Sequence, residues 1–228
     1  MWTRAELKSN AKIVMGQNYW KTVLVAFLIM IAVGGSTSSN ITNTYSNASS
    51  QGFGGIFDFP QAFAVAGIIM TVMLFSFIIA MALNIFLFKP LEVGCRRYLI
   101  SARQAPGNLS LLAFGFKHSY MNIVKTQFFR WLYTFLWTLL LVVPGIIKSY
   151  EYRMMPYILA ENPALDTNEV FARSREMMTG NKMNAFVLDL SFIGWHILGG
   201  FTCGLLNLFY VNPYQQSTNA ELYEALRR

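Results

Sequence analysis

Charged residues are scarce in this 228-residue sequence: Asp, Glu, Lys and Arg together make up 13% of it, against 54% hydrophobic residues. A soluble domain is typically about one-quarter charged, because water must wet its surface. The deficit is concentrated, since residues 22–57 and 59–88 contain no charged residue at all. A helix needs about 20 mostly apolar residues to cross a bilayer. The composition therefore excludes an ordinary water-soluble protein and predicts a membrane protein with several crossings.

Cysteines and catalytic motifs are also scarce. Cys95 lies in a basic segment and Cys203 in a glycine-rich apolar one, so we expect the two on opposite sides of the membrane, unable to pair. Neither has partners at metal-ligand spacing. We find no nucleotide-binding loop, metalloprotease motif, nucleophile elbow or pair of catalytic carboxylates. The sequence therefore predicts no catalytic residue, no metal site and no cofactor.

The net charge of +7 comes from basic residues that flank the apolar runs. Membrane proteins mark their cytoplasmic side in this way, whereas a nucleic-acid-binding protein would gather its basic residues in one region. We therefore expect the lipid bilayer and its anionic headgroups as partners, and no nucleic acid. A homo-oligomer or a second membrane protein stays open as a further partner.

The N-terminal residues 3–16 are predicted to form an amphipathic surface helix. Thr3 and Glu6 make a capping box, and apolar residues recur every four positions: Leu7, Ala11 and Met15. A first span follows at residues 19–35. A cleaved signal peptide is the alternative for the apolar run 22–33, but we favour an uncleaved span because export signals need no preceding helix.

Residues 34–61 are rich in Ser, Thr, Asn and Gly and contain no Lys or Arg, which predicts an external loop. A second span at residues 62–88 returns to the inside. After a short predicted helix at residues 109–116, a third span runs over residues 131–143 and ends at Pro144-Gly145.

The second half of the chain allows two topologies. Four spans would leave residues 148–182, with five basic residues, outside the cell, against the positive-inside bias. In the six-span alternative Pro144-Gly145 is an outer turn and no outer connection carries Lys or Arg. Its further elements are spans at 146–159, 183–198 and 205–226 and a cytoplasmic helix at 166–178. We favour six spans, with residues 1–228 as one all-α membrane domain and both termini cytoplasmic.

A weak internal repeat agrees with six spans. KIVMGQNYW at residues 12–20 and REMMTGNKM at residues 175–183 both follow a capped amphipathic helix and both precede a span. FKHSYMNIVK, around Lys117–Lys125, occupies a corresponding place. Three units of a surface helix plus a hairpin would account for the chain, although chance similarity among basic, aromatic membrane borders is the alternative.

Four charged residues fall inside the predicted fourth and fifth spans: Lys148, Glu151, Arg153 and Asp189. A charged group at a bilayer centre costs about 2.5–3.5 kcal/mol on insertion scales, so it needs a partner. Lys148 and Glu151 are three residues apart and can pair on one helix face. Asp189 is expected to pair with the segment 148–153, through Arg153 or Lys148. Such residues form either a polar path or an ion-pair network that locks the helices together.

Two further polar residues complete this candidate intramembrane network. His196 lies seven residues after Asp189 on a similar helix face, where it could relay protons or simply form a hydrogen bond in packing. Asn212 precedes Pro213 in the sixth span, and a proline there frees a backbone carbonyl for water or an ion.

Three long segments resemble a known family: PGIIKSYEYRMMPYILAENP, SREMMTGNKMNAFVLDLSFIGW and VNPYQQSTNAELYEAL. Together with WTRAELKSNAK near the start and KPLEVGCRRY at residues 89–98, they are similar to an uncharacterised bacterial membrane family, the domain-of-unknown-function family 975. The loop at residues 34–61 departs from it as an insertion. The resemblance implies the inner membrane of a bacterium and brings no activity or site residue. A more distant likeness, to the membrane part of some glycerophosphodiester phosphodiesterases, implies a lipid-related role.

The sequence thus favours a non-enzymatic envelope protein, as an accessory, assembly or lipid-organising factor. The alternative is a small transporter or channel that uses the charged residues of the fourth and fifth spans.

Overall fold

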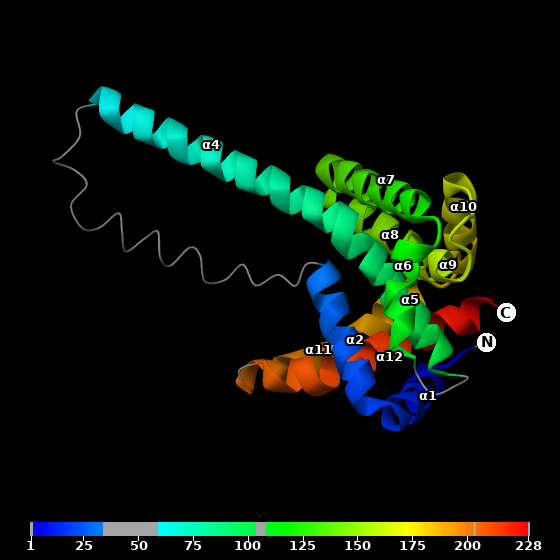
Figure 1. The fold of residues 1–228 in the computed structure, drawn as a ribbon. Coiled ribbons are helices and arrows are strands. Elements are labelled where there is room, and N and C mark those ends of the chain that lie inside the picture. The colour runs from blue at the N-terminus through cyan, green and yellow to red at the C-terminus, as the bar shows by residue number, and fades with distance from the viewer. Residues whose placement is uncertain (1, 34–58, 104–107, 203, 228) are drawn as a thin grey trace. The chain divides into compact units, whose positions relative to one another are not determined.

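The computed structural model describes residues 2–33, 59–103, 108–202 and 204–227, and every regular element within them is a helix (Figure 1). The all-α prediction is confirmed. The chain divides into two compact units, Met1–Val33 with Ile85–Arg228, and Gly34–Asn84. Most of the predicted external loop, residues 34–58, lies outside the described residues.

The second unit contains helix α4 (Phe59–Leu83), which is apolar along its whole length. From Gly67 onward most of its large side chains are exposed, including Met70 at 74% and Phe75 at 65%. The chain continues from α4 through a π-helical turn, η2 (Asn84–Phe88), into α5 (Lys89–Ser101) of the first unit. A helix this apolar buries its surface in lipid or in another protein.

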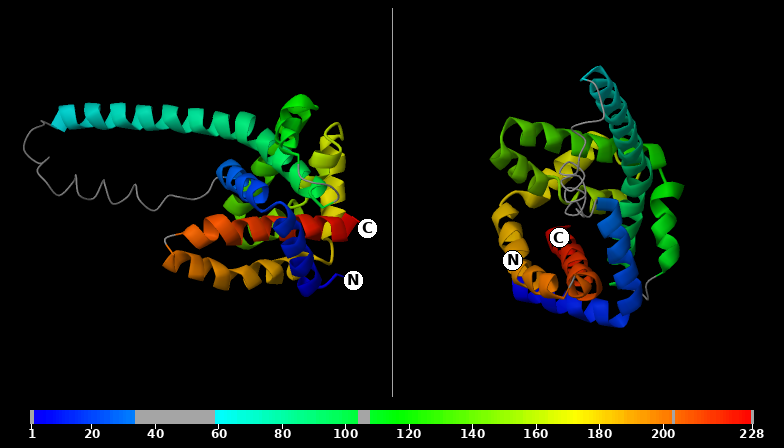
Figure 2. Two further views of the ribbon diagram at one scale, coloured as in Figure 1. Left: turned by 60° about the horizontal axis from the view of Figure 1, so that its bottom comes forward. Right: turned by 90° about the vertical axis from the view of Figure 1, so that its left-hand side faces the viewer.

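The predicted amphipathic N-terminal helix is present as α1 (Arg4–Gln17), and its Thr3 cap accepts a hydrogen bond from the Glu6 amide at 3.3 Å. The predicted apolar stripe is buried: Leu7, Ala11 and Met15. However, α1 packs against α12 (Asn212–Arg227), so protein covers much of the stripe that was expected to face lipid. Figure 2 shows α12 between α1 and α2 (Tyr19–Val33).

Two predicted short helices of the first unit are also confirmed. The first is a 3-10 turn, η3 (Leu109–Ala113), capped by Asn108 and continued by α6 (Phe114–Lys117). The second is α10 (Thr167–Met178), capped by Asp166.

A long helix and a shorter one follow in the middle of the chain. Helix α7 (Tyr120–Leu140) turns at Leu141 and returns as α8 (Val142–Glu151), and the two pack as a hairpin. The predicted fourth span, residues 146–159, is not one helix. It breaks after Glu151 and resumes as α9 (Met155–Glu161), whose residues 155–160 are all buried within the unit.

The last part consists of α11 (Lys182–Phe201), a π-helical turn η4 (Asn207–Val211) and α12. Gly199 of α11 allows close approach, because an added Cβ would collide with the Asn207 side chain. The predicted sixth span, residues 205–226, is helical but polar from Asn212 onward, and its inner face packs on α1, α2 and α5.

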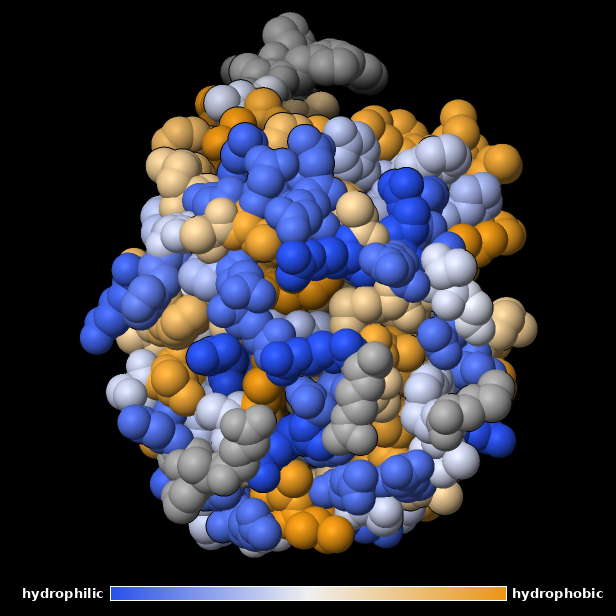
Figure 3. Space-filling view, turned by 90° about the vertical axis from the view of Figure 1, so that its right-hand side faces the viewer, coloured by the Kyte–Doolittle hydropathy of each residue, from blue (hydrophilic) through white to orange (hydrophobic). Residues whose placement is uncertain are grey.

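By length and composition, two helices of the described residues can cross a membrane, Gly67–Ser101 and Lys182–Phe201. Arg4–Gln17 and Tyr19–Met30 would make a third if this pair, bent by 111°, counts as one span. The predicted six-span bundle is therefore not confirmed. Hydrophilic residues dominate the face on which α10 and both termini lie (Figure 3), as expected for a side that meets water.

Candidate functional site

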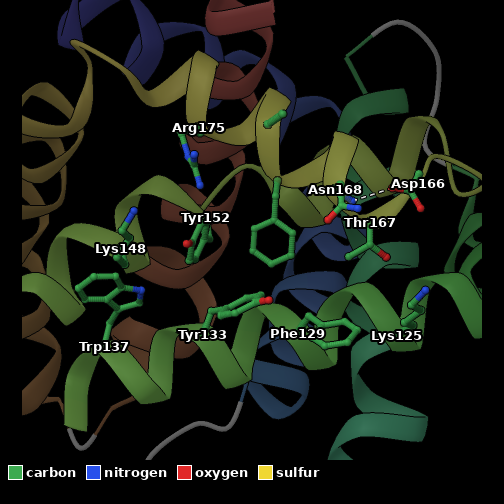
Figure 4. Close-up of a pocket in the computed structure, with 12 residues that line it drawn as sticks. Lys125, Phe129, Tyr133, Trp137, Lys148, Tyr152, Asp166, Thr167, Asn168 and Arg175 are labelled. Carbon is green, nitrogen blue, oxygen red and sulfur yellow. Dashed lines mark hydrogen bonds between the residues drawn. The ribbon is translucent and has the colours of Figure 1, made fainter. Parts of the chain in front are cut away.

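A groove of about 560 Å³ opens between helices α7, α8 and α10 (Figure 4). Its lining combines aromatic rings with basic side chains: Lys125, Phe129, Tyr133, Trp137, Lys148, Tyr152, Asp166, Thr167, Asn168, Phe171, Ala172 and Arg175. Asp166, the one carboxylate among these lining residues, accepts a hydrogen bond from the Asn168 amide as the cap of α10. The groove is therefore basic and aromatic at once.

One wall of the groove is a single face of α7. Lys125, Phe129, Tyr133 and Trp137 are spaced four residues apart, which places them in a row along a helix. Phe129 and Tyr133 stack with their ring centroids 6.1 Å apart. Tyr133 and Trp137 are 43% and 39% exposed, so their rings are available to a ligand.

The opposite wall comes from α8 and α10. Phe171 of α10 packs edge-to-face against Tyr133 at 5.5 Å and against Tyr152 at 4.9 Å, which joins the two walls. The Lys148 ammonium lies 5.6 Å from the centre of the Trp137 ring and 5.8 Å from that of Tyr152. Cations at such distances are attracted to the ring faces. The Lys148 ammonium and the rings of Trp137 and Tyr152 thus form one continuous surface of the groove.

Glu151 holds two of the basic groups of the groove in place. Its carboxylate accepts hydrogen bonds from Lys148 at 3.0 Å, Arg175 at 2.8 Å and Lys182 at 2.8 Å, and it is buried. The predicted Lys148–Glu151 pair is confirmed, while Arg175 and Lys182 were not expected. One carboxylate facing three cations leaves the cluster with excess positive charge.

Burial of the Glu151 carboxyl acts to raise its pKa. The hydrogen bonds from Lys182 and Lys148, and the charges of these lysines, act in the opposite direction and outweigh it. The net result is a pKa below the ordinary value, so Glu151 stays charged at neutral pH.

Asp189 of α11 has the partner that the sequence predicts. Arg153 donates to both of its carboxylate oxygens, at 2.6 and 2.8 Å, and the Tyr150 hydroxyl donates at 2.8 Å. Arg153 also donates to Asn219 of α12 at 2.7 Å. Arg153 therefore connects three segments: the end of α8, α11 and α12.

His196 and Asn212 stand apart from this cluster. The His196 Nε2 lies 3.1 Å from the Gln215 Oε1, and the Asn212 amide donates to the Met30 sulfur at 3.5 Å. Among the described residues, neither shares a hydrogen bond with the four charged residues of the predicted network. That part of the chain also contains no group of His, Cys, Asp and Glu able to hold a metal ion.

A second buried polar cluster lies between α5, α7 and α9. Arg96 donates to Glu92 at 3.4 Å and to the Tyr157 hydroxyl at 3.0 Å, and Lys89 lies 3.5 Å from Glu92. Gln216 of α12 also accepts from Arg96. This cluster was not predicted, because Glu92 and Arg96 fall in a basic segment of the sequence, whereas in the structure they are buried residues of α5.

A family model described as "Protein of unknown function (DUF975)" matches residues 99–228, more than half of the chain. The chain belongs to the DUF975 family. All groove residues of this DUF975 member lie within the matched part, whereas the resembling segments near the start and at residues 89–98 lie outside it. No curated protein and no solved structure matches the chain.

The groove of this DUF975 member could have been found from its sequence by one signal. This signal is the regular four-residue spacing of Lys125, Phe129, Tyr133 and Trp137, which places them on one helix face. The same spacing also occurs in ordinary membrane spans, so it indicates a groove only when the opposite wall is known. That wall depends on the break after Glu151, which turns the chain toward α10. Hydropathy gives no sign of the break.

Proposed function

We propose that the protein is a multi-pass protein of the bacterial inner membrane that binds an anionic lipid in the groove between α7, α8 and α10. Both termini then lie in the cytoplasm. In this proposal the protein acts as a lipid-organising or accessory factor of the envelope, and the proposed occupant is an anionic headgroup with part of its acyl chains.

The observation that carries the proposal is the mixed lining of the groove. Lys125 forms no ion pair within the part of the chain that the structure describes, and it lies at one end of the aromatic row. Arg175 has 58% of its side chain exposed although it contacts Glu151. Both can donate to phosphate oxygens. The rings of Tyr133 and Trp137 suit the boundary between headgroups and chains, where Tyr and Trp are enriched.

The neighbouring surface supports a lipid over a water-soluble anion. The α7–α8 hairpin continues beyond Trp137 into an exposed apolar tip, with Leu140 at 70% and Val143 at 67% exposure. A groove that opens beside such a tip meets acyl chains as soon as the tip enters a bilayer.

The transport alternative is less well supported by the same residues. Arg153 and Asp189 satisfy each other in a two-point ion pair, with Tyr150 and Asn219 completing it. This arrangement fixes the end of α8, α11 and α12 relative to one another. The charges of Arg153 and Asp189 are already paired, so they are not available to bind a charged substrate. We therefore interpret these residues as a structural lock.

Binding of lipid to purified protein tests the proposal. Native mass spectrometry should detect bound phosphatidylglycerol in preference to phosphatidylcholine. Lys125→Gln should weaken this binding roughly fivefold, since one lysine near an anionic surface contributes about 1 kcal/mol. Trp137→Leu should weaken it as well, by removing the ring beside Lys148.

Matched controls are available outside the groove. Lys117→Gln removes an exposed lysine at the end of α6, and Trp131→Leu removes a tryptophan of α7 of nearly equal exposure that stacks on Phe135 instead. Neither should change lipid binding. Equal loss in the control and groove variants would contradict the site. Competition by glycerol phosphate alone, with no dependence on acyl chains, would indicate a soluble anion instead of a lipid.

A further inference from the structure

The tip of the α7–α8 hairpin is an unusually apolar exposed surface. Five consecutive residues, Leu139 to Val143, are each between 61% and 73% exposed, and Ile146 and Ile147 add to them on α8. An exposed run of this kind on a soluble protein would be an aggregation site or an interface. Within the described residues nothing covers it.

Charged residues mark where this apolar surface ends. Counting back from the tip, the first charged residue on α7 is Arg130, ten residues before Leu140, and on α8 it is Lys148, six residues after Val142. At 1.5 Å per residue these arms are about 15 Å and 9 Å long. The hydrocarbon core of a bilayer is about 30 Å thick, so one leaflet is about 15 Å. The α7 arm is long enough to reach the bilayer centre, the α8 arm is long enough to enter a little more than half of one leaflet, and both are too short to cross.

Arg130 is anchored at the base of the hairpin. It donates to the Gln127 side chain at 3.2 Å and lies 3.9 Å from Glu92 of α5. Lys148 is likewise held by Glu151. Neither basic residue can follow the tip deeper into a membrane without breaking these contacts, so both fix the depth of insertion.

The backbone of the turn suits an environment without water. The Leu141 amide donates to the Trp137 carbonyl at 3.1 Å, and the Gly145 amide donates to the Leu141 carbonyl at 3.2 Å. The hydroxyls of the apolar part also donate to carbonyls of their own helix, Thr134 to Arg130 and Thr138 to Thr134, each at 2.8 Å. Pro144 lies in the first turn of α8, where its missing N–H is no loss. These two amides and two threonine hydroxyls are thus paired within the hairpin, which lowers the cost of placing them in hydrocarbon.

We propose that the α7–α8 hairpin is re-entrant: it inserts into one leaflet, turns inside the hydrocarbon of that leaflet and leaves on the side it entered. Its partner is the acyl-chain layer of the leaflet whose headgroups meet Lys125, Lys148 and Arg175. Residues 148–182, with their basic side chains, then stay on the same side as Lys125 and Arg130, in agreement with the positive-inside bias. The inference rests on the proposed membrane location, but not on the lipid site of the groove.

A re-entrant hairpin places Pro144-Gly145 at a different depth from the one predicted from the sequence. In the predicted six-span topology these residues lie outside the cell, as the outer turn of two crossing helices. A crossing needs about 20 apolar residues in each arm, and the segment from Trp131 to Ile147 has to serve for both arms. The turn therefore belongs inside the membrane and not on its outer side.

Single cysteines in reconstituted vesicles test the depth of the turn. In a background with Cys95→Ala and Cys203→Ala, Leu141→Cys should not react with a membrane-impermeant maleimide added to either face, and should react after detergent is added. A nitroxide at the same position should show the higher oxygen accessibility of the hydrocarbon layer compared with the headgroup region. Glu176→Cys, on the polar side of α10, should react from one face.

Each other result would overturn the inference. Reaction of Leu141→Cys from the face opposite to Glu176→Cys would show a crossing, and reaction from the same face would show that the tip is not inserted. Disulfide formation between two copies at Leu141, with loss of oxygen accessibility, would show a second copy as the partner. If Leu141→Cys does not fold, Leu140→Cys gives the same comparison. A protected turn in a protein that fails to select anionic lipid would leave this inference standing and refute the lipid site.

Discussion

One arginine, Arg153, forms hydrogen bonds with two helices that lie far from it in the sequence, α11 and α12. Its guanidinium makes two parallel hydrogen bonds to Asp189 and a third to Asn219. Two-point pairs of this kind are directional, because the planar guanidinium matches the carboxylate. The pair therefore sets the register of α11 against the end of α8.

Asp189→Asn should destabilise the protein by about 1–3 kcal/mol, because it leaves the charge of Arg153 with an incomplete partner. The midpoint of thermal unfolding in detergent would measure this. Glu169→Gln is a matched control, since the Glu169–Arg173 pair has both side chains 48% exposed and surface pairs contribute about 0–1 kcal/mol. The double exchange of Asp189→Arg with Arg153→Asp should recover part of the loss. No recovery would argue that packing, not charge, accounts for the effect.

Glu151 predicts a dependence of stability on pH. The folded-state pKa of Glu151 is lowered, so its stabilising effect is complete above the unfolded pKa, about 4.3, and is lost as pH falls through the folded value. Unfolding midpoints of the wild type and of Glu151→Gln, measured between about pH 3 and pH 7, would show this. The variant should be less stable at pH 7, and the difference should shrink on acidification. A constant difference would contradict the assignment.

At the scale of whole elements, the hairpin depends on one glycine. A Cβ on Gly145 would lie 2.6 Å from the Thr138 Cα, a backbone position that cannot move aside without separating α7 from α8. Gly145→Ala should therefore lower the unfolding midpoint and widen the groove.

Gly194→Ala is the control for this substitution, because a Cβ at Gly194 meets nothing within 4 Å. That variant should be neutral or more stable, since Ala is favoured over Gly inside a helix by about 1 kcal/mol. Equal destabilisation of both variants would show that glycine flexibility, rather than close approach, matters at position 145.

The elements show which sequence signals could be trusted. Caps and four-residue stripes predicted α1 and α10 well, because these signals are local: Thr3 and Asp166 cap them as expected. The positive-inside bias was the signal that favoured a span at residues 146–159, where the structure has a helix break after Glu151. The second part of this segment, α9, is buried in protein, and a rule based on the charges of the connections cannot detect that. The pairing of Asp189 with Arg153 was predictable from the free-energy cost of an unpaired charge in a membrane. The hydrogen bond from Arg153 to Asn219 was not predictable, because it depends on the path of α12.

At the scale of the whole molecule, the first unit brings the two ends of the chain together. Trp2 and Ala225 line one pocket, and α1 packs along α12. Epitope tags at the two termini should therefore be accessible from the same face of sealed vesicles. The sequence places residue Ser49 on the other face, so Ser49→Cys should react only there. Tags accessible from opposite faces would exclude this arrangement of α1 and α12.

The half-depth hairpin also has a mechanical consequence. Two adjacent helices, each about 10–12 Å across with their side chains, displace lipid from one leaflet and leave the other leaflet at full density. The area of the membrane then differs between its two surfaces wherever the protein accumulates. Such an asymmetry is relieved when the bilayer bends outward on the hairpin's side, so we expect each copy to act as a small wedge that prefers curved membrane.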